Sequence, residues 1–526
     1  MNDVTYLPPL DPAGLLSAGR RERDLAHLAA GARVDVLVIG GGITGVGVAL
    51  DAVTRGLSVA LVEQDDLANG TSRWSSKLVH GGLRYLAKGD PGVAWESAVE
   101  RSILAGRVAP HLVHPLAQVV PDFDDDRRSA PLALVGQRAG DALRLAARTP
   151  TGLLPRARHV DPDMTVKLVP GIRREGLRGA SVGWDCQLVD DARLVVSVAR
   201  TAAAYGARIL TRVQVTAVDP QLGEVAARDT VTGQNVTLHA DTIVNATGVW
   251  ASDLDDSITL HPSLGTHVVV PTALVGAGHG SLTVPVPGTI GRFVLSLPQL
   301  GGISYVGLTD HETDTDSYSA PTPPTEDIDW ILGILSTALE RPVTPSDALG
   351  AFAGVRPLVQ ADDTGDESSA DISRKHLVRR TDRMITVTGG KLTTFRRMAQ
   401  DVVNLISETP CRTRDIALVG AGPLVRRQDI PEVLWRRYGN EAPHVWDLGE
   451  TRRELREPIV EGSSHYGVEA EFGIAAELAL TVADIVERRT RIGVVDEARI
   501  PAAVRVAGLT DGRLPTSLER GDALMV

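Results

Sequence analysis

Three glycines and one acid near the start of the chain have the spacing of a dinucleotide-binding turn. Gly40, Gly42 and Gly45 follow an apolar run at 35–39, and Glu63 closes a second apolar run. The first glycine permits a tight turn, the second lets the backbone approach a pyrophosphate, and the third lets helix and strand pack closely. An acid about twenty residues after the turn is expected to bind a ribose hydroxyl. The stretch therefore predicts a strand–turn–helix–strand unit that binds NAD or FAD; a glycine-rich turn without a ligand is the alternative.

A loop at 65–86 follows this unit and is dense in hydroxyls, glycines and basic side chains. A surface loop rich in turn formers is the plain alternative. So many hydrogen-bond donors directly after a dinucleotide-binding unit favour a loop that lies along the cofactor. The candidate cofactor-binding residues in it are Thr71, Ser72, Ser75, Ser76, Lys77, His80, Gly81 and Gly82.

Two later segments end apolar runs in glycine-containing sequences. The run at 241–246 ends in a Thr-Gly pair, where glycine leaves room for a backbone that passes close to a cofactor. The run at 384–387 leads through a Gly-Gly-Lys-Leu-Thr sequence into a helix, whose first amides can face a negative charge. A hydroxyl at Thr393 also suits the helix N-cap. We expect cofactor contacts from Thr247, Gly248, Gly390, Lys391, Leu392 and Thr393.

The composition of the 526 residues argues against several classes of protein. The net charge of −12 argues against general nucleic-acid binding, and it requires a local cationic pocket for any anionic substrate. Cys186 and Cys411 imply neither a disulfide framework nor a metal site, and they suit a reducing cytoplasm. The N-terminus lacks the pattern of a signal peptide, and acids interrupt the most apolar long stretch, 472–486. We therefore expect a cytoplasmic protein without a bound metal.

Five motifs in combination resemble those of the FAD-dependent sn-glycerol-3-phosphate dehydrogenases, and the resemblance covers roughly residues 30–500. They are Ser-Ser-Lys-Leu-Val-His-Gly-Gly-Leu-Arg-Tyr-Leu at 75–86, Asp-Asp-Ala-Arg-Leu at 190–194, Asn-Ala-Thr-Gly-Val-Trp at 245–250, Gly-Val-Arg-Pro-Leu at 354–358 and Gly-Gly-Lys-Leu-Thr-Thr-Phe-Arg at 389–396. The resemblance implies FAD as the cofactor and hydride transfer from C2 of sn-glycerol 3-phosphate to it, giving dihydroxyacetone phosphate. It also implies electron transfer to a membrane quinone and peripheral association with the inner face of the cytoplasmic membrane, and it allows a homodimer.

The resemblance assigns the basic residues to the substrate. Arg84, with Tyr85 beside it, is implied to hold the phosphate, because an arginine fork matches phosphate oxygens. Arg396 is another candidate for the phosphate. Arg356 is implied to lie nearer the reacting carbon, where it would stabilise the developing alkoxide. Lys391 would lie near the substrate and stabilise the negative charge of the reduced flavin.

A histidine is the implied proton acceptor for the C2 hydroxyl. His267 is the candidate, because the ordinary pKa of histidine lies near the working pH, and His80 is the runner-up. Val213 is implied to give backbone contacts to adenine. One position departs from the family pattern: Leu264 stands where a basic residue usually precedes the glycine. Any contact that this base makes is therefore missing here.

The apolar pattern predicts which elements position these residues. Short β-branched runs dominate 261–380, which is typical of an antiparallel sheet. Helical spacing predicts helices at 13–30, 96–111, 130–147, 327–339, 429–438 and 465–492. The predicted fold class is α/β plus α+β: a two-dinucleotide-binding-type FAD domain with an inserted antiparallel-sheet substrate domain and a C-terminal helical domain. The predicted boundaries are 1–33 for a leader helix, 34–120, 181–255 and 381–408 for the FAD domain, 121–180 and 256–380 for the substrate domain, 409–505 for the helical domain and 506–526 for a tail.

Three other functions share parts of this pattern. A glycerol-3-phosphate oxidase would differ only in passing electrons to oxygen. An amine or amino-acid oxidase would share the glycines and Glu63, but the Arg84-Tyr85 pair argues against it. A dinucleotide-binding scaffold without catalysis is disfavoured by the set of Arg356, Lys391 and His267.

We expect the substitution Arg84→Ala to raise KM strongly for the phosphorylated substrate. The reason is that loss of a charged hydrogen-bond pair costs about 1.5–3 kcal/mol. Steady-state kinetics of the variant measure this directly. An unchanged KM would remove Arg84 from the phosphate site.

Overall fold

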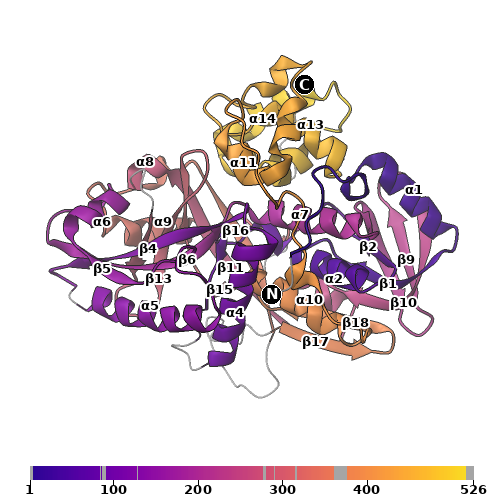
Figure 1. Ribbon diagram of the computed structural model, residues 1–526, viewed down its shortest axis with the longest axis horizontal. Helices are drawn as coiled ribbons and strands as arrows, with labels where there is room; N and C mark the ends of the chain where they lie inside the picture. Colours follow the sequence, from indigo (N-terminus) through magenta and orange to yellow (C-terminus); the bar gives the residue numbers. More distant parts are fainter. Residues whose placement is uncertain are drawn as a thin grey trace.

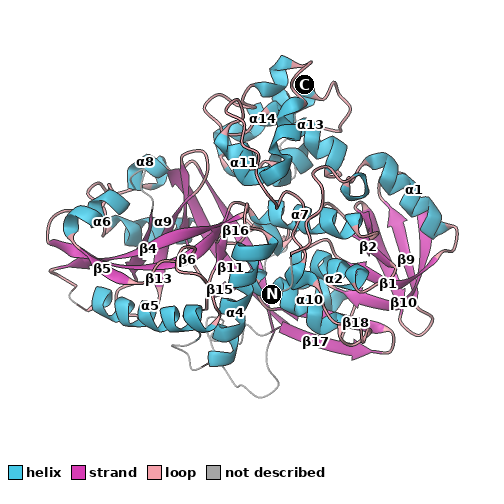
Figure 2. Ribbon diagram, in the orientation of Figure 1, coloured by secondary structure: helices cyan, strands magenta, loops and turns pink. Residues whose placement is uncertain are grey.

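Two β-sheets lie side by side, and a helical C-terminal domain packs above them (Figure 1). This computed structural model describes residues 4–82, 85, 90–126, 128–275, 280–289, 291–313, 317–359 and 376–516. The predicted fold class, an α/β part and an α+β part with a C-terminal helical domain, is confirmed by this arrangement (Figure 2).

The first sheet is the predicted dinucleotide-binding sheet. Within the described residues it contains β1 (Arg33–Ile39), β2 (Val59–Val62), β7 (Arg208–Leu210), β8 (Val213–Asp219), β9 (Glu224–Asp229), β10 (Asn235–Asn245), β17 (His376–Thr381) and β18 (Met384–Gly389). Strands β1, β2, β10 and β18 run parallel, in the order β18-β10-β1-β2. Their carboxyl ends therefore meet at one edge of the sheet, where open α/β sheets bind ligands.

Helices cover the first sheet with very close packing. Helix α2 (Ile43–Thr54) packs between α7 (Asp191–Ala204) and α10 (Phe395–Val403). A Cβ atom at Gly47 would lie 2.9 Å from the ring of Phe395, so the missing side chain lets α2 and α10 approach. Helix α1 (Ala18–Ala29) packs beside β7 and β10.

The second sheet is mainly antiparallel. In the described part of the chain it comprises β3 (Leu78–Val79), β4 (Val113–Phe123), β5 (Arg158–Val160), β6 (Leu177–Leu188), β11 (Leu260–Pro271), β12 (Gly280–Pro285), β13 (Phe293–Pro298), β14 (Ile303–Gly307), β15 (His311–Glu312) and β16 (Gly350–Val359). Its helices are α5 (Ser129–Ala146), α6 (Pro162–Leu168), α8 (Thr272–Val275) and α9 (Thr325–Ser336).

The predicted domain boundaries at 120 and 181 need correction. They fall inside β4 and β6, which pair with each other along their length in the second sheet. Strand β3, predicted to lie in the FAD domain, also pairs with β6. We propose that the chain passes from the first sheet to the second before β3 and returns after β6.

Two predicted helices are shorter than their apolar patterns suggested. The predicted helix 96–111 is α4 (Pro91–Ile103), followed by a π-helical turn, η3 (Leu104–Val108). The predicted single helix at 465–492 is wrong. Helix α13 (Gly467–Ala476) stops before Leu478, whose positive φ of 56° breaks the helix, and a π-helical segment η10 (Asp484–Arg489) follows separately. The remaining helices of the C-terminal domain are α11 (Glu432–Tyr438), α12 (Ala442–Asp447) and α14 (Asp496–Leu509), the last of which enters the predicted tail.

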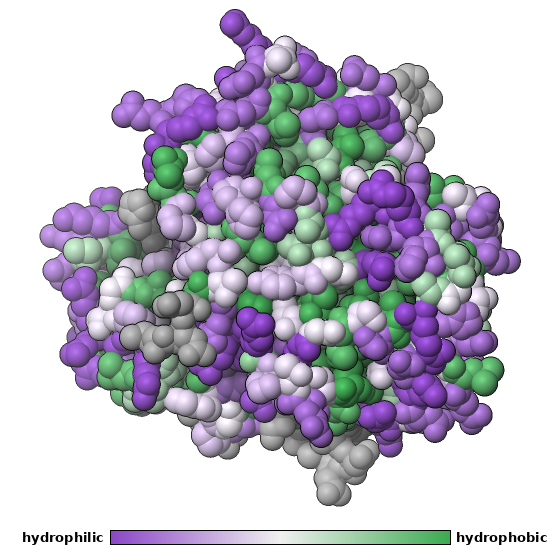
Figure 3. Space-filling view, turned by 45° about the vertical axis from the view of Figure 1, so that its right-hand side comes forward, coloured by the Kyte–Doolittle hydropathy of each residue, from purple (hydrophilic) through white to green (hydrophobic). Residues whose placement is uncertain are grey.

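The surface shows no continuous apolar belt on the face seen in Figure 3. Hydrophilic residues cover much of the outer rim there, and apolar residues gather in smaller groups between them. Among the described residues, no helix combines the length and the apolar character that crossing a membrane requires.

Candidate functional site

A cavity of about 1500 Å³ lies where the carboxyl edge of the first sheet meets the second sheet. Gly40, Glu63 and Thr247 line it from the first sheet, and His267 and Arg356 line it from the second. The cavity therefore brings together candidate residues from five distant parts of the chain.

The glycine turn has the close backbone packing that its sequence predicted. Gly40 adopts a φ of 111°, and a Cβ atom there would lie 2.6 Å from the carbonyl oxygen of Ala246 on the neighbouring strand. A Cβ atom at Gly45 would overlap the carbonyl oxygen of Gly40. Gly42 is the N-cap of α2 and lines the cavity, so its bare backbone and the helix start face the space where an anion would bind.

Glu63 closes the turn from the end of β2. One carboxylate oxygen accepts a hydrogen bond from the amide of Gly41 at 2.6 Å, and the other accepts from the amide of Asp65 at 2.9 Å. Burial raises the pKa of Glu63 to about 7; these two amides oppose the shift, and the charges of Asp65 and Asp66 add to it. Burial removes water from this carboxylate, and a ligand hydroxyl that donates a hydrogen bond to it would replace that water.

The donor-rich loop contributes five of its predicted residues to the cavity wall. They are Thr71, Ser72, Ser75, Ser76 and His80. Ser72 accepts from the amide of Ile43 at 2.9 Å, so it supports the first turn of α2 as well. Thr71 donates to the carbonyl of Val355 at 2.6 Å, which ties the loop to β16 of the second sheet.

The other three predicted residues of this loop have structural partners instead. Lys77 is buried, and its ammonium group donates to Asp191 at 2.9 Å; the expected cofactor contact of its side chain is therefore corrected to an ion pair. The backbone of Gly81 donates to Asp185 at 3.0 Å, and a Cβ atom there would overlap Arg101 of α4. Gly82 packs against the same helix with a φ of 78°. Both glycines are needed for close packing rather than for lining the cavity.

The start of β8 and the end of β10 also contribute to the cavity wall. Val213 lines the cavity and donates its amide to the carbonyl of Glu63 at 2.8 Å. Thr247 and Gly248, after β10, line it too, and Gly248 has a φ of 66°. Both segments therefore lie at the cavity wall, and their contact with a cofactor stays a prediction.

The segment after β18 also lines the cavity, through Gly390, Lys391, Leu392 and Thr393. Lys391 donates to the hydroxyl of Ser97 at 2.6 Å, and its ammonium nitrogen lies 4.0 Å from the centre of the Tyr85 ring. The predicted N-cap at Thr393 is wrong, because a short 3-10 helix (Leu392–Thr394) comes first and Thr394 holds the N-cap position of α10.

His267 lies deep in the wall on β11. Its Nε2 lies 2.9 Å from the hydroxyl of Ser76, and its ring stacks on Phe352 at 4.9 Å. A Cβ atom at Gly307, its partner on β14, would lie 2.6 Å from the imidazole, so only glycine leaves space for this ring. Burial lowers the pKa of His267 well below its usual value, and the charges of Lys77 and Arg356 lower it further.

Arg356 lies on β16, in register with Ser263 of β11. Because side chains four residues apart on a strand share a face, Arg356 and His267 point to the same side of the second sheet. Arg356 pairs with Asp310 at 3.1 Å, and a Cβ atom at Gly265 would overlap its guanidinium. Gly265 therefore makes room for the arginine.

Of the arginines predicted to bind phosphate, Arg396 does not line the cavity. Arg396 is buried and donates to Glu100 of α4 at 2.8 Å, so it is corrected to a structural ion pair. Arg84 lies outside the described residues, whereas its neighbour Tyr85 is buried and lines the cavity.

Sequence reasoning missed the carboxylates that hold the second sheet's polar residues in place. Asp310 holds Arg356, and Asp327 of α9 accepts from Thr266, Thr309 and His311. The only local signal in the sequence was the position of Asp310 soon after a β-branched run.

Leu264, at the position where a basic residue was expected, packs into an apolar cluster with Val249, Ala353 and Val355. In the described part of the chain no cluster of His, Cys, Asp and Glu side chains has the arrangement of a metal site.

Comparisons with known proteins agree with this geometry. The model of the family described as FAD dependent oxidoreductase matches residues 35–395, and that of the C-terminal domain of alpha-glycerophosphate oxidase matches residues 411–514. Glycerol-3-phosphate dehydrogenase 1 of Mycobacterium tuberculosis is 46% identical over 508 residues, covering 93% of this chain and 98% of that protein. The mitochondrial glycerol-3-phosphate dehydrogenase of Macaca fascicularis is 33% identical, over 93% of this chain and 72% of that protein. The solved glycerol-3-phosphate dehydrogenase of Bacillus halodurans complexed with FAD has a TM-score of 0.69 and 26% identity, covering 94% of each chain.

We expect the His267 ring to stay neutral between about pH 6 and pH 8, because burial and two nearby cations disfavour its protonated form. NMR of histidine-labelled protein measures this, with the resonance assigned by its loss in His267→Asn. The resonance of the exposed His444 is the reference peak in the same spectra. A midpoint near 6.5 for His267 would contradict the burial argument.

Proposed function

The chain belongs to the FAD-dependent glycerol-3-phosphate dehydrogenases, and on this basis we propose that it oxidises sn-glycerol 3-phosphate to dihydroxyacetone phosphate. The observation that carries the proposal is one cavity lined by a buried histidine and two basic side chains beside a dinucleotide cradle. These are His267, Arg356 and Lys391. Bound FAD supplies the acceptor for the hydride from C2.

The wall of the cavity fits the two halves of FAD in order. We assign the pyrophosphate to Gly40 and Gly42 at the start of α2, and the adenosine to Glu63 and Val213. The flavin half is assigned to residues from the donor-rich loop and from the ends of β10 and β18. They are Thr71, Ser72, Ser75, Ser76, His80, Thr247, Gly248, Gly390, Lys391, Leu392 and Thr393.

His267 is assigned as the base. Its ring is neutral because of burial and two neighbouring cations, so a ring nitrogen can accept the proton of the C2 hydroxyl. The hydroxyl of Ser76 is within hydrogen-bond distance and fixes the orientation of the ring. His80, which also lines the cavity, remains the runner-up.

Arg356 is assigned to the oxygen on C2, where it stabilises the negative charge that develops as the proton leaves. Asp310 and the carbonyl of Thr309 hold its guanidinium from one side. Lys391 and Tyr85 lie together at the cavity wall, and we assign them to the substrate. The assignment of the phosphate to Arg84 rests on the resemblance alone.

For the electron acceptor we propose a membrane quinone. Exposed apolar side chains of α5 and α9 form part of the cavity rim; they are Leu132, Val135 and Trp330. An apolar rim suits a quinone ring and a peripheral contact with the cytoplasmic membrane. Oxygen is the second candidate, because the family model that matches residues 411–514 takes its name from an oxidase. A homodimer and a cytoplasmic location stay predictions from the resemblance.

We expect purified protein to be yellow and to bleach with sn-glycerol 3-phosphate under anaerobic conditions. Bleaching should be slower by about 10²–10³ in Arg356→Met, because a charge that stabilises the developing oxyanion is lost. Arg292→Met, at an exposed position of the cavity wall, is the matched control. Bleaching by sarcosine but not by sn-glycerol 3-phosphate, or equal loss in both variants, would contradict the proposal.

The electron acceptor is tested on the same reduced enzyme. We expect rapid return of the yellow colour with a soluble quinone analogue and slow return in air, because the apolar rim favours a quinone. Stopped-flow absorbance gives both rates, and a peroxide assay follows the reaction in air. Stoichiometric peroxide at the faster rate would instead identify an oxidase.

A further inference from the structure

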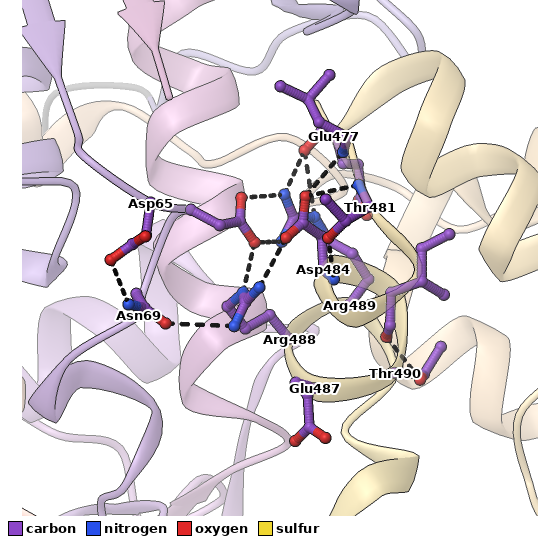
Figure 4. Close-up of polar contacts among 12 residues, drawn as sticks. Asp65, Asn69, Glu477, Thr481, Asp484, Glu487, Arg488, Arg489 and Thr490 are labelled. Carbon is purple, nitrogen blue, oxygen red and sulfur yellow. Dashed lines mark hydrogen bonds and ion pairs between the residues drawn. The ribbon is translucent and has the colours of Figure 1, made fainter. Parts of the chain in front are cut away.

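A buried ion network joins the C-terminal domain to the loop after β2. Figure 4 shows the carboxylate of Asp65 pointing to Asn69, and Asn69 facing Arg488 of the C-terminal domain. Asn69 donates to Asp65 at 2.9 Å and accepts from Arg488 at 3.3 Å. The loop that carries these residues begins directly after Glu63.

Asp66 is the centre of this contact. Its carboxylate is fully buried and accepts from Arg488 at 2.6 Å and from both terminal nitrogens of Arg489 at 2.7 and 2.9 Å. Burial alone would raise the pKa of Asp66, but the charges of Arg489 and Arg488 outweigh it and hold the pKa well below its usual range. The carboxylate therefore stays ionised, and its partners in the network come from the C-terminal domain.

Amides on both sides of Asp66 connect the loop to Glu63 and to the glycine turn. The amide of its neighbour Asp65 donates to Glu63 at 2.9 Å, and the amide of Ala68 donates to the carbonyl of Gly41 at 3.0 Å. Gly41 in turn donates to Glu63 at 2.6 Å. A displacement of the loop would therefore move the carboxylate of Glu63 and one amide of the glycine turn together.

Asp484 provides a second connection, through Arg212. One of its oxygens accepts from Arg212 at 2.6 Å and from Arg488 at 2.7 Å. Arg212 has a φ of 61°, a conformation that non-glycine residues rarely adopt, and its amide donates to Asp65 at 3.0 Å. The next residue, Val213, lines the cavity beside Glu63. Both segments assigned to adenosine are thus held from the C-terminal domain.

We propose that the C-terminal domain is a clamp for the adenosine half of FAD, with Arg488, Arg489 and Asp484 as positioning residues. Without these partners the buried carboxylate of Asp66 would be uncompensated, so the loop would rearrange and release Glu63. The inference rests on the assignment of Glu63 to the ribose and not on the identity of the substrate. Clamping and cofactor binding are reciprocal: FAD must also strengthen the docking of this domain.

The test measures binding of FAD and of ADP, the fragment that occupies only the adenosine and pyrophosphate part. Full-length protein stripped of FAD is titrated with FAD by fluorescence quenching and with ADP by calorimetry. In Arg489→Gln we expect both dissociation constants to rise by the same factor, roughly 5- to 100-fold. Asp66→Asn should raise both dissociation constants in the same way. The double variant Asp66→Asn/Arg489→Gln should bind FAD and ADP no more weakly than either single variant, because both substitutions remove the same contact.

The matched control is Arg499→Gln. Arg499 forms a buried ion pair with Glu487 at 2.8 Å inside the same domain, and Figure 4 shows Glu487 pointing away from the network. This variant should keep the ADP affinity. An equal loss in the control, additive single losses, or an ADP affinity that Arg489→Gln leaves unchanged would each overturn the clamp.

A second measurement needs no substitution, in case Arg489→Gln does not fold. Hydrogen exchange of the unmodified apoprotein is followed at residues 484–491 with and without ADP. The clamp requires slower exchange in the presence of ADP, and equal exchange would overturn it. Because neither measurement uses turnover, a failure of the proposed oxidation would leave both results interpretable.

Discussion

The pairing of buried charges governs how this protein is assembled. An isolated charge inside a protein is very costly, so each buried cation requires a carboxylate nearby. Here the pairs connect segments that are remote in sequence: Lys77 with Asp191, Arg396 with Glu100, and Arg193 with Glu477. They join the donor-rich loop, the helices around the first sheet and the C-terminal domain into one scaffold. Arg356 and Lys391, in contrast, line the cavity, as the proposed binding of an anionic substrate requires.

The two sheets contribute different parts of the cavity because their strands run in different directions. Parallel strands bring their carboxyl ends to one edge, which suits the extended cofactor. The antiparallel pair β11 and β16 places Arg356 and His267 on one face, and glycines at 265 and 307 leave space for the two large side chains. The hydrogen bond from Thr71 to Val355 links the two sheets at the cavity. The residues that we assign to substrate and to cofactor are therefore connected through the two sheets.

The sequence predicted what local backbone geometry determines. The glycine turn, Glu63, and the strand ends at Thr247 and Gly390 could be found because a tight turn or a strand end imposes its residue types nearby. Lys77 and Arg396 could not be separated from ligand-binding cations, because their carboxylate partners lie 114 and 296 residues away. Strand pairing explains the errors in the domain boundaries: 120 and 181 fall inside β4 and β6 because pairing between distant strands leaves no local pattern.

The first sheet is built from strands that are far apart in the sequence, so its parts are synthesised at different times. During translation the glycine turn leaves the ribosome early, as domains fold from the N-terminus. At that stage β10 lacks its parallel neighbour β18, and Asp66 lacks Arg488 and Arg489, which are made more than four hundred residues later. A nascent chain therefore carries the uncompensated acid for most of its synthesis, and the unpaired edge of β10 until β18 has been made. The buried contact at Asp66 can therefore form only after the C-terminal domain has been synthesised.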